Sequence, residues 1–231
     1  MLDIEKIKDI EKIKEIEKSN KYKKKILDIK YESLPFLDFQ STRYNMTAKE
    51  DVSKVYEHAK KNGIPFFNLT SACILCAINE IPELKKRIVN KQVVEYENVS
   101  AVTPILQEDK SIREIEMPPL NYFNTFKEWN DYIQYKKKNI EKEGFTLPPS
   151  KRDEEPIVNF SCIPWVHFES MTNLDYSSIS VYPGITWGKM LDGKIPITLT
   201  ACHIFFFGYH FKLFYENIEK NFKNPELITK I

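Results

Sequence analysis

The clearest pattern along the chain is a series of short apolar runs in its last third. Val, Ile, Phe and Thr are concentrated there, and the pair Asp192-Gly193 is typical of a hairpin turn between two runs. Apolar residues then recur at helical spacing from residue 211 to 222, which predicts a helix packed on a sheet. The strands predicted by this pattern cover residues 157–162, 166–170, 177–181, 185–190 and 195–203.

Three helices are predicted earlier in the chain. Thr47 and Glu50 have the spacing of a capping box, so a helix is expected to follow them and to end before Gly63. Residues 69–81 are apolar on most sides, which predicts a central, buried helix. A third helix is expected over residues 126–142. Together these elements predict an α/β fold, a two-layer sandwich of helices and a mixed, largely antiparallel sheet.

The first 25 residues form a charged segment of low complexity, in which Ile recurs at positions 4, 7, 10, 13 and 16. On a helix of about 3.6 residues per turn, a spacing of three winds the apolar stripe round the helix. A sustained coiled coil needs a repeat of about 3.5 residues instead. We therefore expect a helical N-terminal extension over residues 1–25, solvated rather than an interaction arm, and one domain over residues 26–231.

Composition and charge narrow the classes of function. The 231 residues carry a formal net charge of +1, which does not suggest a nucleic-acid partner. The longest apolar run is far shorter than a membrane span, and the first residues lack the pattern of a secretion signal, so a cytoplasmic protein is expected. Cys73 and Cys76 have no second pair at metal spacing, so we expect packing residues and no metal site.

The candidate chemistry centres on His203, at the end of the last predicted strand. Three phenylalanines, at positions 205 to 207, and then Gly208 follow it closely. A neutral imidazole at a strand end can face a cleft and take a proton from an alcohol or a thiol. The other histidines, His58, His167 and His210, are expected to be structural.

Three segments, in order, resemble those of the chloramphenicol acetyltransferase family. Residues 202–210 are similar to the family's active-site segment His-His-x-x-x-Asp-Gly-Phe-His, with His203 at the second, catalytic histidine. Residues 161–168 resemble its Ser-x-x-Pro-Trp-Val-x-Phe segment, and residues 182–189 resemble its Ala-Pro-Ile-Ile-Thr-Met-x-Lys strand. The similarity covers about residues 44–222.

The resemblance implies an acetyl-CoA-dependent O-acetyltransferase that acts on a small-molecule hydroxyl. By this resemblance His203 is the general base, Ser161 donates to the oxyanion, and Thr186 is an auxiliary group acting through a water molecule. Trp165 and Lys189 are expected to line the coenzyme A channel. Each position has a structural alternative: an ordinary strand hydroxyl for Ser161 and Thr186, core packing for Trp165 and a solvated charge for Lys189.

Departures from the family pattern leave a second hypothesis open. Phe207 stands where the family has an aspartate that pairs with an arginine near the N-terminus, and no arginine precedes Arg43. Cys202 replaces the first histidine. Because exchanging both partners of a buried ion pair for apolar residues can be neutral, phenylalanine packing is expected to order the loop. The alternative to an enzyme is a degenerate relative that keeps the fold and binds without catalysis.

The resemblance also implies an assembly. The family is a homotrimer in which the histidine of one subunit meets the acceptor pocket of the next, so a cyclic homotrimer of this chain is expected. A role in antibiotic resistance is implied in the same way. The altered N-terminal third leaves the acceptor open, chloramphenicol included.

Overall fold

The computed structural model describes residues 4–145, 152–174 and 181–230. Among these residues, one sheet has the strand order β2-β9-β8-β7-β5-β6 and a smaller one the order β1-β4-β3. The strands are β1 Lys24–Lys30, β2 Arg43–Asp51, β3 Lys86–Val89, β4 Gln92–Tyr96, β5 Ser100–Leu106, β6 Ile112–Met117, β7 Ile157–Ile163, β8 Gly184–Gly188 and β9 Lys194–Cys202. The helices are α1 Ile4–Asn20, α2 Ser53–Asn62, α3 Phe66–Asn79, α4 Phe126–Lys138, α5 Ile140–Glu143, α7 Gly208–Lys223 and α8 Pro225–Thr229.

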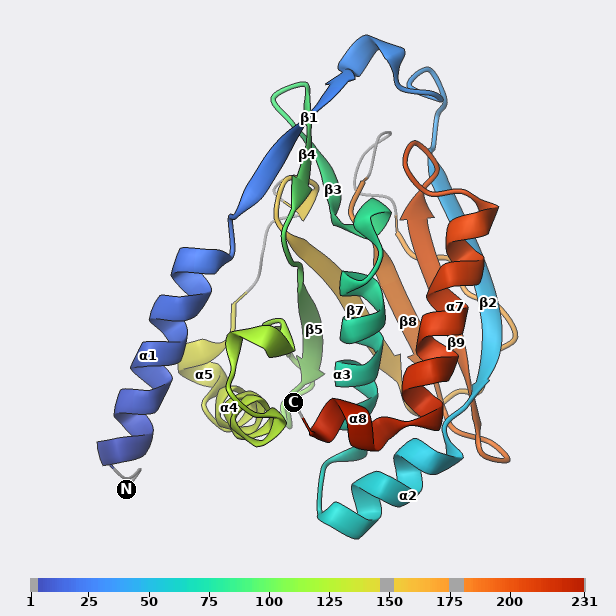
Figure 1. The fold of residues 1–231 in the computed structure, drawn as a ribbon. Coiled ribbons are helices and arrows are strands. Elements are labelled where there is room, and N and C mark those ends of the chain that lie inside the picture. The colour runs from blue at the N-terminus through green and yellow to red at the C-terminus, as the bar shows by residue number, and fades with distance from the viewer. Residues whose placement is uncertain (1–3, 146–151, 175–180, 231) are drawn as a thin grey trace.

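The larger sheet is mixed, as expected. The pairs β2–β9, β9–β8 and β5–β6 are antiparallel, whereas β7 runs parallel to both β8 and β5. Helices α3 and α7 lie side by side across one face of this sheet (Figure 1). The expectation of an α/β two-layer sandwich is confirmed.

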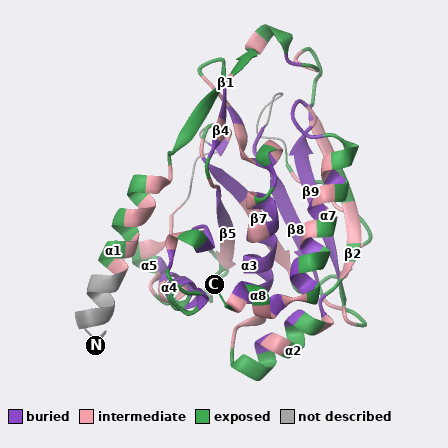
Figure 2. Ribbon diagram, viewed as in Figure 1, coloured by how far each residue is buried: buried purple, intermediate pink, exposed green. Residues whose placement is uncertain are grey.

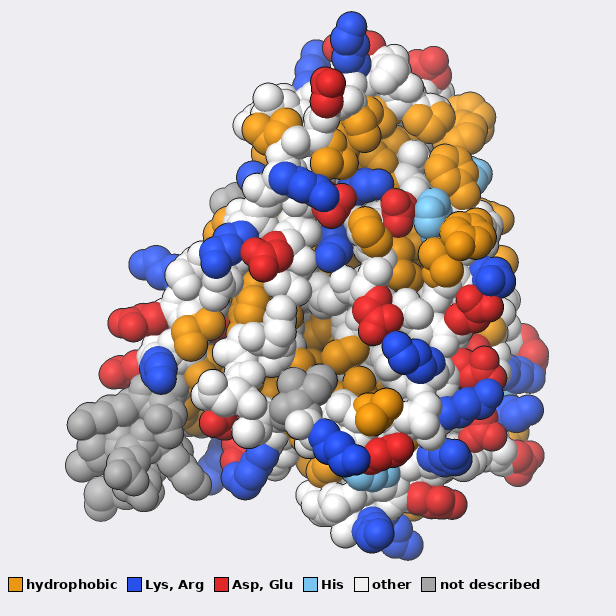
Figure 3. All heavy atoms as spheres, viewed as in Figure 1, with side chains coloured by type: hydrophobic (Ala, Val, Ile, Leu, Met, Phe, Trp, Pro, Cys, Tyr) orange, Lys and Arg blue, Asp and Glu red, His pale blue; other side chains and the backbone are white. Residues whose placement is uncertain are grey.

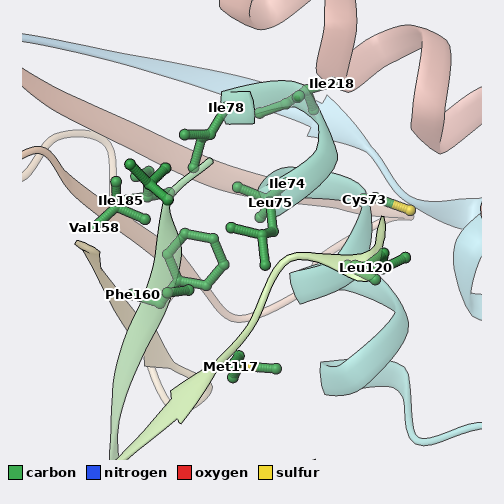
Figure 4. Packing of buried hydrophobic residues seen from close by; sticks show 14 of the residues in the cluster. Cys73, Ile74, Leu75, Ile78, Met117, Leu120, Val158, Phe160, Ile185 and Ile218 are labelled. Atoms are coloured by element: carbon green, nitrogen blue, oxygen red, sulfur yellow. The ribbon is translucent and has the colours of Figure 1, made fainter. Parts of the chain in front are cut away.

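The main core lies between this sheet and α3. Figure 4 shows Ile74, Leu75 and Ile78 of α3 opposite Phe160 and Ile185 of the sheet, and all five are at most 1% exposed. Burying one such side chain contributes about 1.5–3 kcal/mol. Figure 2 shows burial across the whole molecule: α3 and the inner strands are buried, and β1 is largely exposed. The prediction of a central, buried helix from this apolar run is therefore confirmed.

One predicted helix start is wrong. Thr47 and Glu50 lie in β2, which pairs with β9 along its whole length, and α2 begins only at Ser53. A long antiparallel ladder outweighs a local capping pattern. The carboxylate of Asp51 accepts the Ser53 N–H at 2.9 Å, so a different side chain serves the helix start. Gly63 ends the helix with a left-handed φ of 64°, as predicted.

The turn between β8 and β9 also agrees with the sequence, since Asp192 and Gly193 have φ values of 51° and 75°. The strand expected over residues 166–170 is not formed. That segment belongs to an irregular loop over residues 164–174. The strand expected over 177–181 lies almost entirely outside the described residues. The chain after β7 therefore covers the sheet as a loop instead of extending it.

Helix α1 is docked on the domain rather than fully solvated. Lys14 Nζ lies 2.8 Å from the Glu143 carboxylate, and the Tyr132 hydroxyl donates to Glu17 at 2.9 Å. Ile10 packs partly buried against the core. None of the helices in the described part of the chain is long and apolar enough to cross a membrane.

Candidate active site

His203 follows β9 in a turn that fixes its ring by hydrogen bonds. Its backbone N–H donates to the Thr42 carbonyl at 2.7 Å, and its Nδ1 lies 2.9 Å from the Phe206 carbonyl oxygen. Because a carbonyl oxygen only accepts, Nδ1 carries the proton in this contact. The Nε2 of the neutral ring then keeps its lone pair, which is the tautomer that a general base acting through Nε2 requires.

Aromatic rings surround the His203 imidazole. Phe36 stacks on it at 4.8 Å between centroids and 13° between planes, while Tyr44 lies at 4.6 Å and Phe207 at 5.2 Å. Tyr44 in turn meets Phe211 of α7 at 4.9 Å, so the imidazole lies on the helix-covered side of the sheet. Phe36 holds a left-handed φ of 63°, a strained conformation that its surroundings must maintain. The imidazole is half-buried and is not sealed by these rings.

Phenylalanine packing orders the loop after His203, in agreement with the sequence. Phe205 and Phe206 are buried. Phe207, at the position of the family aspartate, is exposed, and its backbone N–H donates to His210 Nδ1 at 2.8 Å. Apolar burial and a backbone hydrogen bond therefore hold this loop.

Ser161 and Thr186 lie side by side on the other face of the sheet. The register pairs Ser161 with Thr186, Thr186 with Thr198, and Thr198 with Thr47. Paired residues of neighbouring strands point to the same face, so these four hydroxyl side chains form one row. The hydroxyls of Thr47 and Thr198 are 2.7 Å apart.

Asn173 covers this row from the loop after β7. Its Oδ1 accepts from the Thr186 hydroxyl at 2.9 Å, and its Nδ2 donates to Thr200 Oγ1 at 3.0 Å. Both threonines are fully buried, where an unpaired hydroxyl would cost about 1–3 kcal/mol. Gly184 provides the room, because a Cβ there would lie 3.0 Å from Asn173 Nδ2. Sequence reasoning missed Asn173, since no local motif signals a contact between loop and sheet.

A cavity of about 290 Å³ opens beside Ser161. Met171 and Leu174 give it apolar walls, and His203 is not among the described residues that line it. A mixture of apolar walls and a few polar groups is typical of small-molecule sites. Its polar side chains are Arg43, Asn159, Ser161, Thr172, Asn173 and Tyr182.

Trp165 and Lys189 lie together where β7 and β8 end. Trp165 is 68% exposed, and Lys189 is also exposed. The Lys189 N–H donates to the Val166 carbonyl at 2.8 Å, and His167 Nδ1 donates to the Lys189 carbonyl at 2.9 Å. These contacts hold an exposed aromatic ring and an exposed cation at one end of the sheet.

Within one chain the five candidate residues form separate groups. Ser161 and Thr186 adjoin on one face, and Trp165 and Lys189 share one strand end. His203 lies apart, because β9 runs antiparallel to β8 and carries the chain to the opposite end. Ile197 pairs with Trp187 near the end of β8, and the six residues from Ile197 to His203 span roughly 20 Å.

The cysteines are packing residues in this structure. Burial raises the pKa of the Cys76 thiol to about 12 and that of the Cys162 thiol to about 11. Both therefore stay protonated at neutral pH. In the described ranges, no three His, Cys, Asp or Glu side chains are placed to hold a metal ion.

The amino-acid sequence is similar to those of known proteins. A family profile described as chloramphenicol acetyltransferase matches residues 21–219. A chloramphenicol acetyltransferase of Staphylococcus aureus is 26% identical over 186 residues, which are 76% of this chain and 83% of the relative. One of Bacillus pumilus is 27% identical over 178 residues, 72% of this chain and 77% of the relative.

The fold is also similar to those of solved structures. A chloramphenicol acetyltransferase structure matches with a TM-score of 0.73 at 25% identity and covers 85% of this chain and 99% of its own. A dihydrolipoamide acetyltransferase of Azotobacter vinelandii has a TM-score of 0.58 at 11% identity, covers 86% of this chain and 85% of its own, and so shares the fold alone.

The fold is thus one that acyltransferases use. Within that class, the chain belongs to the chloramphenicol acetyltransferase family. Helix α1 precedes the matched residues.

Proposed function

We propose that this chain is an acetyl-CoA-dependent O-acetyltransferase in which His203 is the general base. The observation that carries the proposal is the 2.9 Å contact between His203 Nδ1 and the Phe206 carbonyl, because it leaves the Nε2 lone pair for a proton. The acceptor hydroxyl has a pKa far above 7. A positioned base that removes its proton during attack contributes about 10²–10⁴-fold in rate.

Ser161 donates a hydrogen bond from its hydroxyl to the oxyanion that forms when the acceptor oxygen attacks the thioester carbonyl. A donor of this kind contributes about 10²–10³-fold in kcat. When the tetrahedral centre collapses, the carbon–sulfur bond breaks and His203 returns its proton to the leaving sulfur. The Thr186 hydroxyl donates to Asn173, so Thr186 acts as an acceptor that orients a water molecule near the oxyanion.

Trp165 and Lys189 suit a coenzyme channel for physical reasons. Trp165 presents a large exposed ring that can cover an apolar arm, and Lys189 presents a mobile point charge that attracts phosphate. No step in this proposal needs a metal ion. Acetyl-CoA is the co-substrate and supplies the activated acetyl group.

We infer that the active unit is a homotrimer. Exposed aromatic side chains lie on the segments next to the base: Phe39 is 59% exposed, Phe207 42% and Tyr209 62%. Figure 3 shows hydrophobic side chains gathered beside histidines over the N-terminal end of α7. Exposed apolar patches of this kind mark interaction surfaces. A cyclic trimer would bring His203 of one copy to the Ser161 cavity of the next, giving three equal sites.

An assay that follows the free thiol of coenzyme A tests the proposal. The wild type is given a panel of small alcohols that includes chloramphenicol. We expect His203→Ala to lower kcat by at least about 10²-fold. His58→Ala is the matched control, because His58 bonds Thr229 at 3.0 Å away from the site and should keep full activity. Equal rates for wild type and His203→Ala would remove His203 from the mechanism.

A second candidate is a degenerate relative that binds without turnover. The observation that favours it is Phe207 in place of the family aspartate, together with the lack of any arginine before Arg43. This candidate predicts coenzyme A binding without acetyl transfer to any alcohol of the panel. Phe207→Asp alone would not restore activity, because the N-terminal arginine partner is missing from the sequence.

A further inference from the structure

Three consecutive lysines at the end of α4 have different surroundings. Lys136 is buried, donates to the Glu116 carbonyl at 3.0 Å and lies 3.6 Å from the Glu17 carboxylate. Lys138 is exposed, and Lys137 is half-buried. Because the three are neighbours on one helix, differences in their chemistry come from what each side chain touches.

Neutral groups enclose Lys137. Its Nζ donates to Asn68 Oδ1 at 2.7 Å and lies 4.1 Å from the centroid of the Phe67 ring. Asn68 is fully buried, and its Nδ2 donates to Asn130 Oδ1 at 2.9 Å, so the acceptor of Lys137 is itself held in place. The titratable group that acts on Lys137 from another element is the Cys162 thiol of β7. In the part of the chain that the structure describes, no carboxylate pairs with Lys137.

These surroundings favour the neutral amine. Burial lowers the pKa of Lys137 from 10.5 to about 8, although the Cys162 thiol acts in the opposite direction. Cys162 is itself uncharged at pH 8, because burial raises its pKa to about 11. Lys21 is a useful contrast: burial alone would lower its pKa, but Glu116 at 2.8 Å raises it. The presence of a counter-ion therefore decides which partly buried lysine stays charged.

We propose that Lys137 is a nucleophilic lysine and a site of N-acylation by acyl thioesters. Its neutral Nζ attacks the thioester carbonyl carbon, so that a carbon–nitrogen bond forms and the carbon–sulfur bond breaks. The sulfur leaves as a thiolate, and the proton lost from nitrogen passes to it through solvent. The products are an amide and a thiol. Asn68 Oδ1 accepts an N–H from Nζ before the reaction and from the amide afterwards, so it holds the nitrogen throughout.

The modification would change the charge of this region. Acylation removes the cation that lies over Phe67 and leaves a neutral amide beside Cys162. The reaction uses neither His203 nor Ser161, so it is independent of the proposed O-acetyltransferase activity.

Acyl labelling of the folded full-length chain tests this inference. The probes are S-acetyl-N-acetylcysteamine, a small acyl thioester, and acetyl-CoA, with site-resolved rates from mass spectrometry of chymotryptic peptides. At pH 8 about half of Lys137 is neutral, against about 0.3% of a lysine with an ordinary pKa. A less basic amine is also a weaker nucleophile, so we expect Lys137 to react roughly 10-fold faster than Lys138. Its rate should level off above about pH 8, where the neutral fraction of Lys137 saturates.

Cys162→Asp and Cys162→Asn form a matched pair of variants. The aspartate places a carboxylate beside Lys137, and we expect it to slow labelling of Lys137 about 10-fold, while the asparagine leaves the rate near that of the wild type. Labelling in the folded His203→Ala variant should equal that of the wild type.

Three outcomes would overturn the inference: equal rates for Lys137 and Lys138, equal rates in the two Cys162 variants, or slower labelling in His203→Ala. The small thioester does not depend on a coenzyme A site. If no alcohol is acetylated, the proposed function fails while the labelling result still decides the role of Lys137.

Discussion

Neighbouring residues of the same strands build the two faces of the larger sheet from different chemistry. Phe160 and Ile185 lie in the apolar core under α3, and the next residues, Ser161 and Thr186, point to the opposite face. Because side chains alternate along a strand, a shift of one residue in register would exchange the two sets. Apolar burial holds the first face, and hydrogen bonds through Asn173 hold the second. The comparison teaches that polar groups can be positioned without any contact to the core helices.

The proposed base and the proposed oxyanion donor belong to different faces. His203 packs on Tyr44, which packs on α7, whereas Ser161 lines the cavity on the other side of the sheet. The hydrogen-bonded strands of the sheet separate the two side chains within one chain. The proposed mechanism therefore requires two copies of the chain, one supplying His203 and the other Ser161.

Complementation between inactive variants tests this separation and has the largest expected effect. His203→Ala and Ser161→Ala should each lower activity by about 10²-fold or more. When both chains are co-expressed in equal amounts, we expect about one quarter of the wild-type activity, because a quarter of the interfaces then combine a native His203 with a native Ser161. Two different affinity tags allow mixed assemblies to be purified and assayed.

The control replaces the Ser161→Ala partner with a chain carrying both substitutions. No interface then contains a native His203, so activity should stay at or below the level of His203→Ala alone. Mixed assemblies that form but recover no activity in the main experiment would show that one chain supplies both groups.

Sequence patterns predicted the helix-covered face of the sheet better than the opposite face, which carries the row of hydroxyl side chains. The apolar run of α3 signals burial by composition alone, and local periodicity is enough to find it. The hydroxyl row depends on partners such as Thr47 and Thr198, which are 151 residues apart, so only tertiary pairing sets their register. The same pairing overrode the capping pattern at Thr47. The contact of Asn173 with Thr186 joins a loop to a strand, and that of Phe36 with His203 joins two segments far apart in sequence, so neither leaves a local motif.

Filling the space beside Asn173 sharpens the comparison on the hydroxyl face. Gly184→Ala places a methyl group 3.0 Å from Asn173 Nδ2, so the amide must move away from Thr186 and Thr200. We expect a loss of about 1–3 kcal/mol in the free energy of unfolding, measured by urea denaturation, because buried hydroxyls lose their partners. Asn173→Ala should cost a similar amount for the same reason.

The double variant shows whether the two losses share one cause. Once Asn173 has been truncated, the methyl group of Gly184→Ala meets little, so the effects should be far from additive. Additive losses would mean that Gly184 acts through something other than Asn173.

The smallest expected effect concerns a charge on the helix-covered side. Burial, and then the nearby Glu219 of α7, raise the pKa of Glu50 from 4.5 to about 7. Between these two pH values the folded state binds more protons than the unfolded state, so Glu50 lowers stability as pH rises, and its penalty is complete above about pH 7. Glu50 is partly exposed, and solvent screens much of the effect.

Glu50→Gln should therefore raise the free energy of unfolding by only about 0.5–1 kcal/mol at pH 8 and by almost nothing at pH 4. Urea denaturation at both pH values, with the exposed Glu57→Gln as control, measures this difference. An equal gain at both pH values would mean that the charge of the Glu50 carboxylate does not cause the loss of stability.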